Sequence, residues 1–276
     1  MSALASNLEW CRWGDQDPLY GTLHWPGKGS DEEDAWCPED FYAVGAQDWS
    51  EYLHHWRAYG LEPASCLEIG CGPGRITLHL ADHFDRVYAA DISDGMLRIA
   101  KSVLTGKKVE LLITDGQSIP LPDMSVTAVF STLVFLHLDK AADAISSFRE
   151  ISRVLRPGGS MMIQLPFYIL PGLAPLLGAI YGCKVRWSQL RAAYRRYRLR
   201  RNRGALIMRG IKYDAAWVKR LLLELSLIDI EFRTFFHRSS AQEIGIVLAR
   251  KPRPGEPPAE SDPVGNAWFG PGMDVM

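Results

Sequence analysis

From residue 64 onward, short apolar runs alternate with segments whose apolar positions recur at helical spacing. Five runs are typical of buried strands: residues 65–69, 86–91, 109–114, 126–131 and 160–165. Helical spacing is found between them, at residues 75–84, 94–104 and 141–155. Strands that alternate with amphipathic helices predict right-handed crossovers and a parallel sheet covered by helices on both faces.

The pattern breaks off at residue 166 and resumes after residue 211. A helix is expected at residues 215–225, capped by Asp214, and two further strands at 228–236 and 243–251. No crossover helix separates these two strands, so they are expected to pair antiparallel. The sequence therefore predicts an α/β fold with a doubly wound, mostly parallel sheet of seven strands and an antiparallel last strand.

Capping and turn residues predict where several elements begin or end. Ser93 and Asp139 precede two of the predicted helices and are expected to cap them. The stretch RPGG at residues 156–159 predicts a turn.

These elements divide the chain into four parts. Residues 1–60 are an aromatic-rich N-terminal extension or lid, in which Trp49, Leu53 and Trp56 share one face of a short helix that ends at Gly60. The other parts are a core at residues 61–165 and 212–252, an insertion at 166–211, and a flexible tail rich in proline and glycine at 253–276.

Charge and cysteine usage narrow the class of protein. The formal net charge is −1, but residues 1–60 are acidic, and no carboxylate occurs from Ile151 to Tyr213, where arginine is frequent. The five cysteines form no C-x-x-C pair, which argues against a disulfide framework or a metal site. No secretory signal is evident, and prolines and glycines interrupt the most apolar stretch, so a cytoplasmic location is expected.

The strongest chemical signal is the glycine-rich stretch CLEIGCGPGR at residues 66–75. A Walker A loop needs a lysine and a hydroxyl residue that this stretch lacks, and the dinucleotide fingerprint needs glycine where Arg75 stands. Glycines alternate at positions 70, 72 and 74, which allows a tight strand-to-helix turn with an open backbone. The helix that follows favours a small anionic group such as a carboxylate.

Two acidic residues lie at the ends of the next strands. Asp91 ends the second strand, where a carboxylate can accept both hydroxyls of a ribose. Asp115 follows the third strand, where a carboxylate could accept the exocyclic amine of adenine. A carboxylate anchor, a ribose acceptor and an adenine acceptor without a phosphate binder fit S-adenosylmethionine better than a nucleotide.

Four motifs in order, LEIGCGPGR, ADIS, DGQSIPLPDMSVTAVFS and REISRVLRPGG, resemble the Rossmann-like, class I S-adenosylmethionine-dependent methyltransferases. The subtype is similar to small-molecule enzymes such as those of quinone biosynthesis. The resemblance covers residues 64–165 and the final strand pair. It implies a set of cofactor-binding residues: Glu68, Gly70, Cys71, Gly72, Gly74, Asp91, Ile92, Met96, Asp115, Gly116, Gln117 and Ser131. Glu68 has a second interpretation as a residue that organises the turn, and Met96 as a core residue.

Methyl transfer from a sulfonium depends mainly on positioning and desolvation, and a general base matters only for an acceptor with a high pKa. His137, just beyond the fourth strand, is the candidate base, with a helix-entry role as its alternative. Tyr42 is expected either to close over the cofactor or to pack.

The insertion is expected to form a substrate cap, with Arg191 and Arg195 on its basic helix. Residues 184–203 have several open interpretations: recognition of an anionic group on a small substrate, binding of RNA or a membrane surface, or a solvated helix that pairs with the acidic N-terminal region. The predicted function is methyl transfer to O, N or C of a small amphipathic or anionic molecule. An RNA methyltransferase and a non-catalytic cofactor-binding scaffold are the alternatives.

Overall fold

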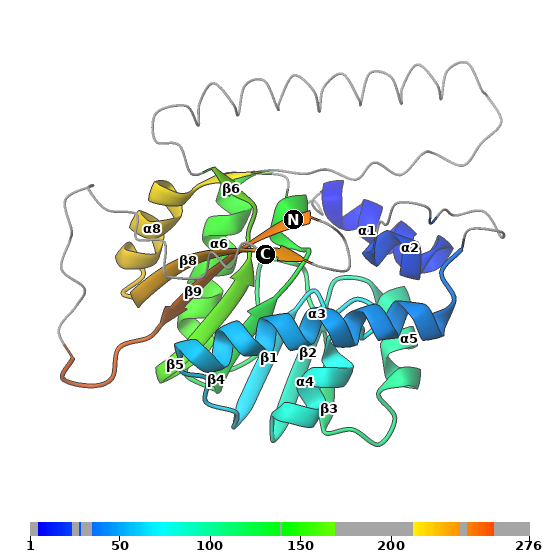
Figure 1. The fold of residues 1–276 in the computed structure, drawn as a ribbon, viewed down its shortest axis with the longest axis horizontal. Helices are drawn as coiled ribbons and strands as arrows, with labels where there is room; N and C mark the ends of the chain where they lie inside the picture. Colours follow the sequence, from blue (N-terminus) through cyan, green and yellow to red (C-terminus); the bar gives the residue numbers. More distant parts are fainter. Residues whose placement is uncertain are drawn as a thin grey trace, which may run out of the picture.

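The computed structural model describes residues 5–23, 28, 35–138, 140–168, 212–237 and 242–256 (Figure 1). Within these residues, a seven-stranded sheet has the order β3-β2-β1-β4-β5-β9-β8. The strands are β1 (Ser65–Ile69), β2 (Arg86–Asp91), β3 (Val109–Ile113), β4 (Val126–Ser131), β5 (Leu155–Gln164), β8 (Ile228–His237) and β9 (Gln242–Arg250). Strands β1 to β5 pair in parallel, and β9 is antiparallel to both β5 and β8. The predicted fold class is therefore confirmed.

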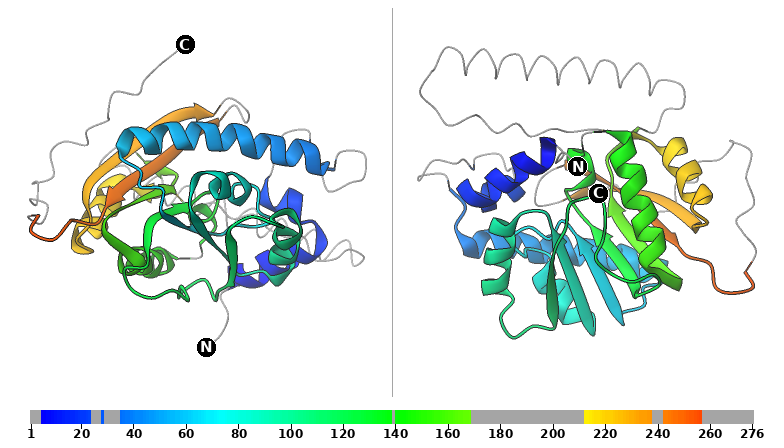
Figure 2. Two further views of the ribbon diagram at one scale, coloured as in Figure 1. Left: turned by 90° about the horizontal axis from the view of Figure 1, so that it is seen from below. Right: turned by 180° about the vertical axis from the view of Figure 1, so that it is seen from behind.

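Helices cover both faces of this sheet (Figure 2). Helices α3 (Pro38–Tyr59), α4 (Thr77–His83) and α5 (Asp94–Val103) lie on one face, and α6 (Ala141–Val154) and α8 (Ala215–Glu224) on the other. On the first face, Trp56 of α3 is fully buried and stacks on Phe130 of β4 at 5.9 Å between ring centroids. On the second face, Phe148 and Ile151 of α6 are fully buried beside Met161 of β5. Burial on both faces explains why the central strands are almost wholly apolar.

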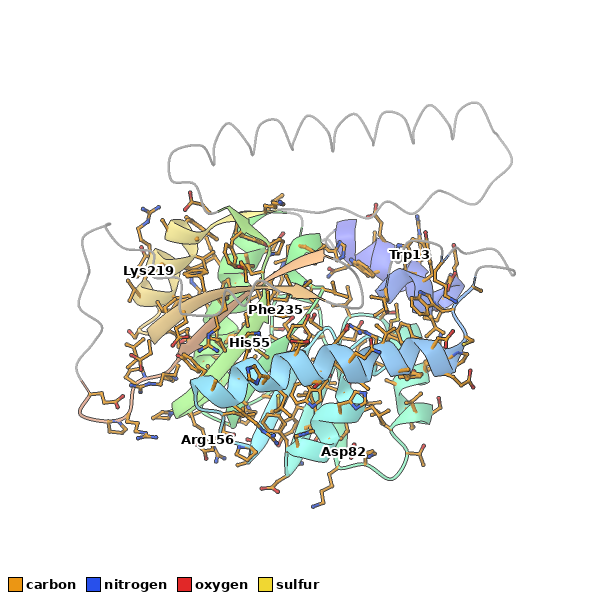
Figure 3. All side chains as sticks on the ribbon, viewed as in Figure 1. Trp13, His55, Asp82, Arg156, Lys219 and Phe235 are labelled. Atoms are coloured by element: carbon orange, nitrogen blue, oxygen red, sulfur yellow. The ribbon has the colours of Figure 1, made fainter. Side chains whose placement is uncertain are left out.

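Helix α3 is much longer than the short helix predicted from three apolar positions. It runs for 22 residues, begins after the N-cap Cys37 and ends at Gly60, which has a φ of 117°. The prediction of its buried face is confirmed, because Trp49, Leu53 and Trp56 are all buried. Figure 3 shows that the helix reaches the far strand β8, where His55 stacks on Phe235 at 4.7 Å between ring centroids.

Two caps are confirmed and one is replaced. Ser93 accepts a hydrogen bond from Met96 N at 3.3 Å, and Asp214 accepts one from Trp217 N at 3.0 Å. The N-cap of α6 is Lys140, whose backbone N–H donates to the Asp143 carboxylate at 3.0 Å. The expected cap Asp139 lies outside the described residues.

The predicted turn at residues 156–159 is wrong, because this stretch belongs to β5. Gly158 has a φ of 83° there, and the pairing of β4 with β5 shifts register between Val126 and Ala128. Proline and glycine therefore mark an irregularity inside the β4–β5 pairing, where residues 156–159 of β5 lie opposite Thr127 alone, rather than the end of a strand.

The insertion is described only at its two ends. Strands β6 (Phe167–Tyr168) and β7 (Tyr213–Asp214) pair in parallel, so the chain leaves and re-enters the core at one place. Of the predicted cap at residues 166–211, residues 169–211 lie outside the described residues, and so do residues 257–276 of the predicted tail at 253–276. Among the helices that the structure describes, none combines the length and the apolar composition of a membrane-spanning segment.

Two short helices precede α3. They are α1 (Ala5–Gln16) and α2 (Pro18–Thr22), and α1 packs beside α5 at the carboxyl edge of the sheet (Figure 1). The Asp15 carboxylate lies 3.2 Å from the Arg98 guanidinium of α5. The sequence predicted a lid in this region but neither of these helices, because residues 5–22 show no clear apolar period.

Candidate functional site

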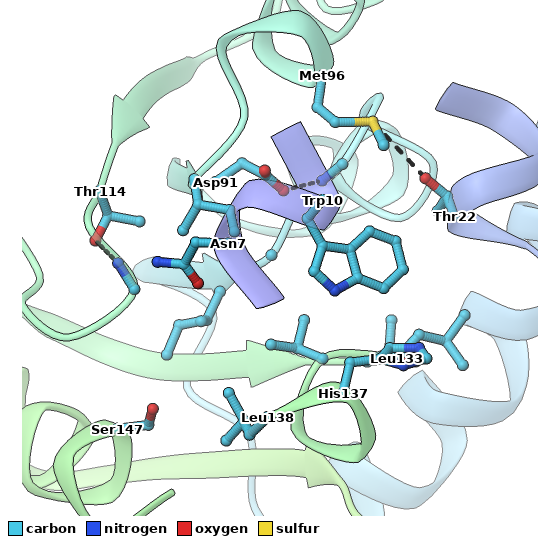
Figure 4. A pocket seen from close by; sticks show the side chains of 17 residues that line it. Asn7, Trp10, Thr22, Asp91, Met96, Thr114, Leu133, His137, Leu138 and Ser147 are labelled. Carbon is cyan, nitrogen blue, oxygen red and sulfur yellow. Dashed lines mark hydrogen bonds between the residues drawn. The ribbon is translucent and has the colours of Figure 1, made fainter. Parts of the chain in front are cut away.

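A pocket opens at the carboxyl ends of β1, β2, β3 and β4, and helix α1 forms one of its walls (Figure 4). It has 17 lining residues: Asn7, Trp10, Thr22, Ile69, Gly70, Gly72, Asp91, Ile92, Met96, Thr114, Gly116, Thr132, Leu133, Val134, His137, Leu138 and Ser147. Seven of the residues predicted from sequence are among them: Gly70, Gly72, Asp91, Ile92, Met96, Gly116 and His137.

The glycine turn forms the floor of the pocket beside β2. Gly70 N and Cys71 N both donate to Ala90 O, at 2.8 and 3.0 Å, so the turn is bound to the end of the neighbouring strand. Gly70 and Gly72 have φ angles of 74° and 53°, a conformation that favours glycine. A Cβ at Gly70 would lie only 2.1 Å from a methyl group of Val134. The turn therefore requires glycine here for both its backbone conformation and its packing.

Asp91 is a buried carboxylate in the wall of the pocket, with 8% of its surface exposed. Its Oδ2 accepts from Gly72 N at 2.8 Å and its Oδ1 from Ser93 N at 2.9 Å. Burial raises the pKa of Asp91, and these backbone N–H groups oppose the rise. A carboxylate has about four acceptor positions. The bonds from the neighbouring backbone do not use all of these positions, so Asp91 can also accept hydrogen bonds from a ligand in the pocket.

Three other predicted residues of this region lie behind the turn rather than in the pocket. Glu68 is buried and accepts from Thr77 Oγ1 at 2.5 Å, and burial raises the pKa of its carboxyl to about 8. Cys71 packs in a cluster with Ala89 and Leu97. Gly74 faces α5, so the three residues lie where they support the turn.

Asp115, Gln117 and Ser131 also lie outside the pocket lining. The exposed Asp115 carboxylate accepts from Ser118 N at 2.8 Å and Gln117 N at 2.9 Å, which lowers its pKa. Gln117 is exposed. Ser131 is fully buried and donates to Ile69 O at 2.9 Å, so its hydroxyl holds β4 against β1.

Helix α1 supplies lining residues that sequence reasoning missed. Asn7 Nδ2 donates to Asp115 O at 2.8 Å, and Cys11 Sγ donates to Ile92 O at 3.5 Å. Trp10 projects into the pocket (Figure 4), and its ring centroid lies 4.8 Å from that of His137. The abundance of tryptophan in the N-terminal region was the one signal that this segment packs against the core.

The candidate base His137 ends a short 3₁₀ helix, η1 (Phe135–His137), directly after β4. Its backbone N–H donates to Val134 O at 2.9 Å, and its side chain lines the pocket. Leu133, which lies between β4 and η1, has a φ of 58°, and its backbone N–H donates to Gln164 Oε1 at 3.0 Å. The predicted place of His137 at the rim of the sheet is thus confirmed. Its catalytic role stays a prediction.

Tyr42 lies against the outer side of the glycine turn and not in the pocket. Its hydroxyl donates to Pro73 O at 2.9 Å, and burial raises its pKa to about 12. The interpretation of Tyr42 as a packing residue therefore fits its position. Arg191 and Arg195, predicted for the substrate cap, lie outside the described residues.

Comparison with known proteins agrees with this geometry. Residues 67–163 match the Methyltransf_11 family, described as a methyltransferase domain. The fold, the glycine turn and this match show that the chain carries a class I, Rossmann-like S-adenosylmethionine-dependent methyltransferase domain. The class and the cofactor expected from the resemblance are confirmed.

Curated relatives match over part of the chain. A malonyl-[acyl-carrier protein] O-methyltransferase of Methylococcus capsulatus is 37% identical over 108 residues, which is 38% of each chain. A ubiquinone/menaquinone biosynthesis C-methyltransferase of Hahella chejuensis is 31% identical over 107 residues, which is 36% of this chain and 42% of that one. The chain therefore spans less than half the length of these relatives.

Solved structures show the same fold. An S-adenosylmethionine-dependent methyltransferase of Leishmania major has a TM-score of 0.57 and 15% identity, and covers 89% of this chain and 83% of its own. One from Methanosarcina mazei has a TM-score of 0.50 and 18% identity, and covers 70% of this chain and 95% of its own. At such low identity the likeness is one of fold.

Proposed function

We propose that this protein transfers the methyl group of S-adenosylmethionine to an oxygen, nitrogen or carbon atom of a small amphipathic or anionic organic molecule. The observation that carries the proposal is the pairing of Asp91 with Gly72 in one pocket wall. A buried carboxylate with unused acceptor positions there adjoins a backbone that has no side chain to block a ligand.

The donor groups of the pocket fit this cofactor. Asp91 would accept the ribose hydroxyls, and Gly70 and Gly72 would admit the methionine part close to the backbone. Ile92 and Met96 supply apolar surface for adenine. When bound, the cofactor supplies an electrophilic methyl group on a sulfonium, so the protein needs no nucleophile of its own.

The remaining lining residues would position the acceptor and exclude water. Leu133, Val134 and Leu138 form an apolar wall beyond β4, and Trp10 covers it from α1. Exclusion of water removes the hydration shell of the nucleophile, and a shaped wall aligns it for in-line attack. Where the acceptor carries a proton with a high pKa, the His137 ring is placed to take that proton.

The names of the relatives support an O or C acceptor on a small organic group. One is an O-methyltransferase of malonyl-[acyl-carrier protein], and another a C-methyltransferase of ubiquinone and menaquinone biosynthesis.

Calorimetry with S-adenosylhomocysteine, the product form of the cofactor, tests the proposal directly. We expect binding to the wild-type protein and a loss of about tenfold or more in Asp91→Ala, since hydrogen bonds to a charged group are removed. Asp82→Ala is the matched control, because Asp82 is an exposed carboxylate on α4. Equal affinity in Asp91→Ala and wild type would refute the assignment of the pocket.

The acceptor is found by incubating cell extract with the protein and labelled cofactor, and reading methyl transfer by mass. Deletion of residues 184–203 is expected to spare cofactor binding and abolish turnover. Retained turnover would show that this segment is not the substrate cap.

A salt-sensitive RNA complex would favour an RNA acceptor. A stable hetero-complex without activity alone would favour a scaffold.

A further inference from the structure

We infer that Asn7, on the N-terminal helix α1, reads the amino-bearing edge of the cofactor's adenine, and that the carboxylate of Asp115 does not. The inference rests on the proposed function, because it assigns base selectivity to a residue of the same pocket. It makes the N-terminal segment part of the cofactor site rather than only a cover over it.

The Asp115 side chain stabilises its own loop. Its Oδ1 accepts three hydrogen bonds, from Gln117 N, Ser118 N and Ser118 Oγ, at 2.9, 2.8 and 3.0 Å. The side chain is exposed and does not line the pocket, whereas its neighbours Thr114 and Gly116 do. The carboxylate therefore fixes the loop after β3 and presents that loop's backbone to the pocket.

The orientation of the Asn7 carboxamide is determined by its partner. Nδ2 donates to Asp115 O at 2.8 Å, and because a backbone carbonyl only accepts, the amide nitrogen must face it. A Cβ placed on Gly116 would lie 3.3 Å from Asn7 Nδ2 and 3.5 Å from Asn7 Oδ1, so the carboxamide lies against Gly116. No donor in the described part of the chain is hydrogen-bonded to Oδ1.

Helix α1 is held so that Asn7 stays in this position. One turn further along the helix, Cys11 donates to Ile92 O, and Trp10 packs against His137. Asp15 pairs with Arg98 at the far end of the helix. These contacts reach the loops after β2 and β4 and helix α5, so Asn7 is supported independently of its own hydrogen bond.

The carboxamide offers what an adenine edge requires. Its free oxygen accepts from an amino group, and its second N–H donates to a ring nitrogen, the pairing by which asparagine recognises adenine in other settings. Hypoxanthine carries an oxygen where adenine carries the amino group. Two acceptors would then face each other, so Asn7 would select adenine over hypoxanthine.

The test compares S-adenosylhomocysteine with S-inosylhomocysteine, in which an oxygen replaces the amino group and the adjacent ring nitrogen carries a proton. Calorimetry gives the affinity ratio of the two ligands for wild type, Asn7→Ala, Asp115→Ala and the exposed α1 control Arg12→Ala. We expect the ratio to fall about fivefold or more in Asn7→Ala, the effect of one neutral hydrogen bond. Asp115→Ala and Arg12→Ala should keep the wild-type ratio, even where loop or helix changes weaken both ligands.

The ratio of the two affinities distinguishes recognition of adenine by Asn7 from a role of Asn7 in anchoring helix α1. If Asn7 only anchors α1, both ligands weaken equally and the ratio is unchanged, which would overturn the inference. The inference would be overturned as well if the affinity ratio fell in Asp115→Ala but stayed at its wild-type value in Asn7→Ala. Absence of S-adenosylhomocysteine binding to the wild-type protein would refute the proposed function and the inference together. Binding with an unchanged ratio in Asn7→Ala would refute the inference alone.

Discussion

Asp48 and Arg75 form a buried ion pair that joins helix α3 to the end of the glycine turn. Their side chains are 5% and 3% exposed. Two other contacts link the same elements: Tyr42 donates to Pro73 O, and a Cβ at Gly45 would lie 2.7 Å from Arg75 O. Helix α3 therefore holds the outer side of the turn whose inner side lines the pocket.

Removal of one partner of this pair should be strongly destabilising, because the other charge stays buried without compensation. We expect Asp48→Leu and Arg75→Met each to lower the free energy of unfolding by about 3–5 kcal/mol. The double variant Asp48→Leu/Arg75→Met should lose less than the sum of the two single variants. Urea denaturation at one pH measures all three changes.

Glu110→Gln is the control for the buried pair. Glu110 pairs with Arg86 at 2.9 Å across β3 and β2, and the two side chains are 49% and 60% exposed. Exposed pairs contribute less than about 1 kcal/mol. Equal losses for the exposed and the buried pair, or strict additivity in the double variant, would show that burial does not govern the Asp48–Arg75 interaction.

Arg75 illustrates what the sequence could and could not predict. Its presence in place of glycine argued against the dinucleotide-binding fingerprint, because that inference needs only residue identity and spacing. Its partner Asp48 is 27 positions away on a helix whose period was recognised only in part. Strands and the positions of Gly70, Gly72 and Asp91 were predictable because apolar runs and glycine spacing are local properties.

The residues that were missed come from contacts between distant segments. Asn7 and Trp10 reach the pocket only because α1 packs beside α5, and no periodic pattern marks α1 in the sequence. Glu68 and Cys71 stand in the motif, yet the direction of their side chains depends on backbone angles that the motif does not specify. The sequence thus located the turn, but it did not show which residues of the turn face the pocket.

Glu68 should make the stability of the protein depend on pH. Burial raises the pKa of its carboxyl to about 8, against an unfolded value near its ordinary 4.5. The folded state therefore holds a proton that the unfolded state releases, and the free energy of unfolding falls as pH rises between these values. The slope due to this one group is at most about 1.4 kcal/mol per pH unit.

Glu68→Gln tests this dependence, since glutamine is neutral at every pH. Urea denaturation from pH 5 to pH 8 should show a shallower decline in the variant, with the largest difference at the alkaline end. The nearby Arg75 and Asp91 charges act on Glu68 in opposite directions and remain in both proteins. Parallel pH profiles would mean that Glu68 is ionised in the folded protein throughout this range.

A side chain at Gly70 should abolish cofactor binding through local distortion of the turn. The Cβ of Gly70→Ala would overlap Val134, and its φ of 74° is unfavourable for alanine. We expect loss of S-adenosylhomocysteine binding in calorimetry, partly restored in Gly70→Ala/Val134→Ala. Gly60→Ala is the control, because its φ is also positive but its Cβ would contact nothing within 4 Å. It should lose about 1 kcal/mol of stability and keep full affinity.

His137→Ala is expected to separate catalysis from cofactor binding once the acceptor is identified. The His137 ring lines the pocket beside Trp10, so its removal deprives the acceptor of a nearby proton acceptor. If the acceptor carries a proton with a high pKa, turnover should fall about 10²- to 10⁴-fold while the affinity for S-adenosylhomocysteine stays unchanged. The exposed His54→Ala on α3 serves as the control and should keep wild-type turnover. Wild-type turnover in His137→Ala would assign His137 to packing against Trp10, whereas a parallel loss of affinity would make it a binding residue.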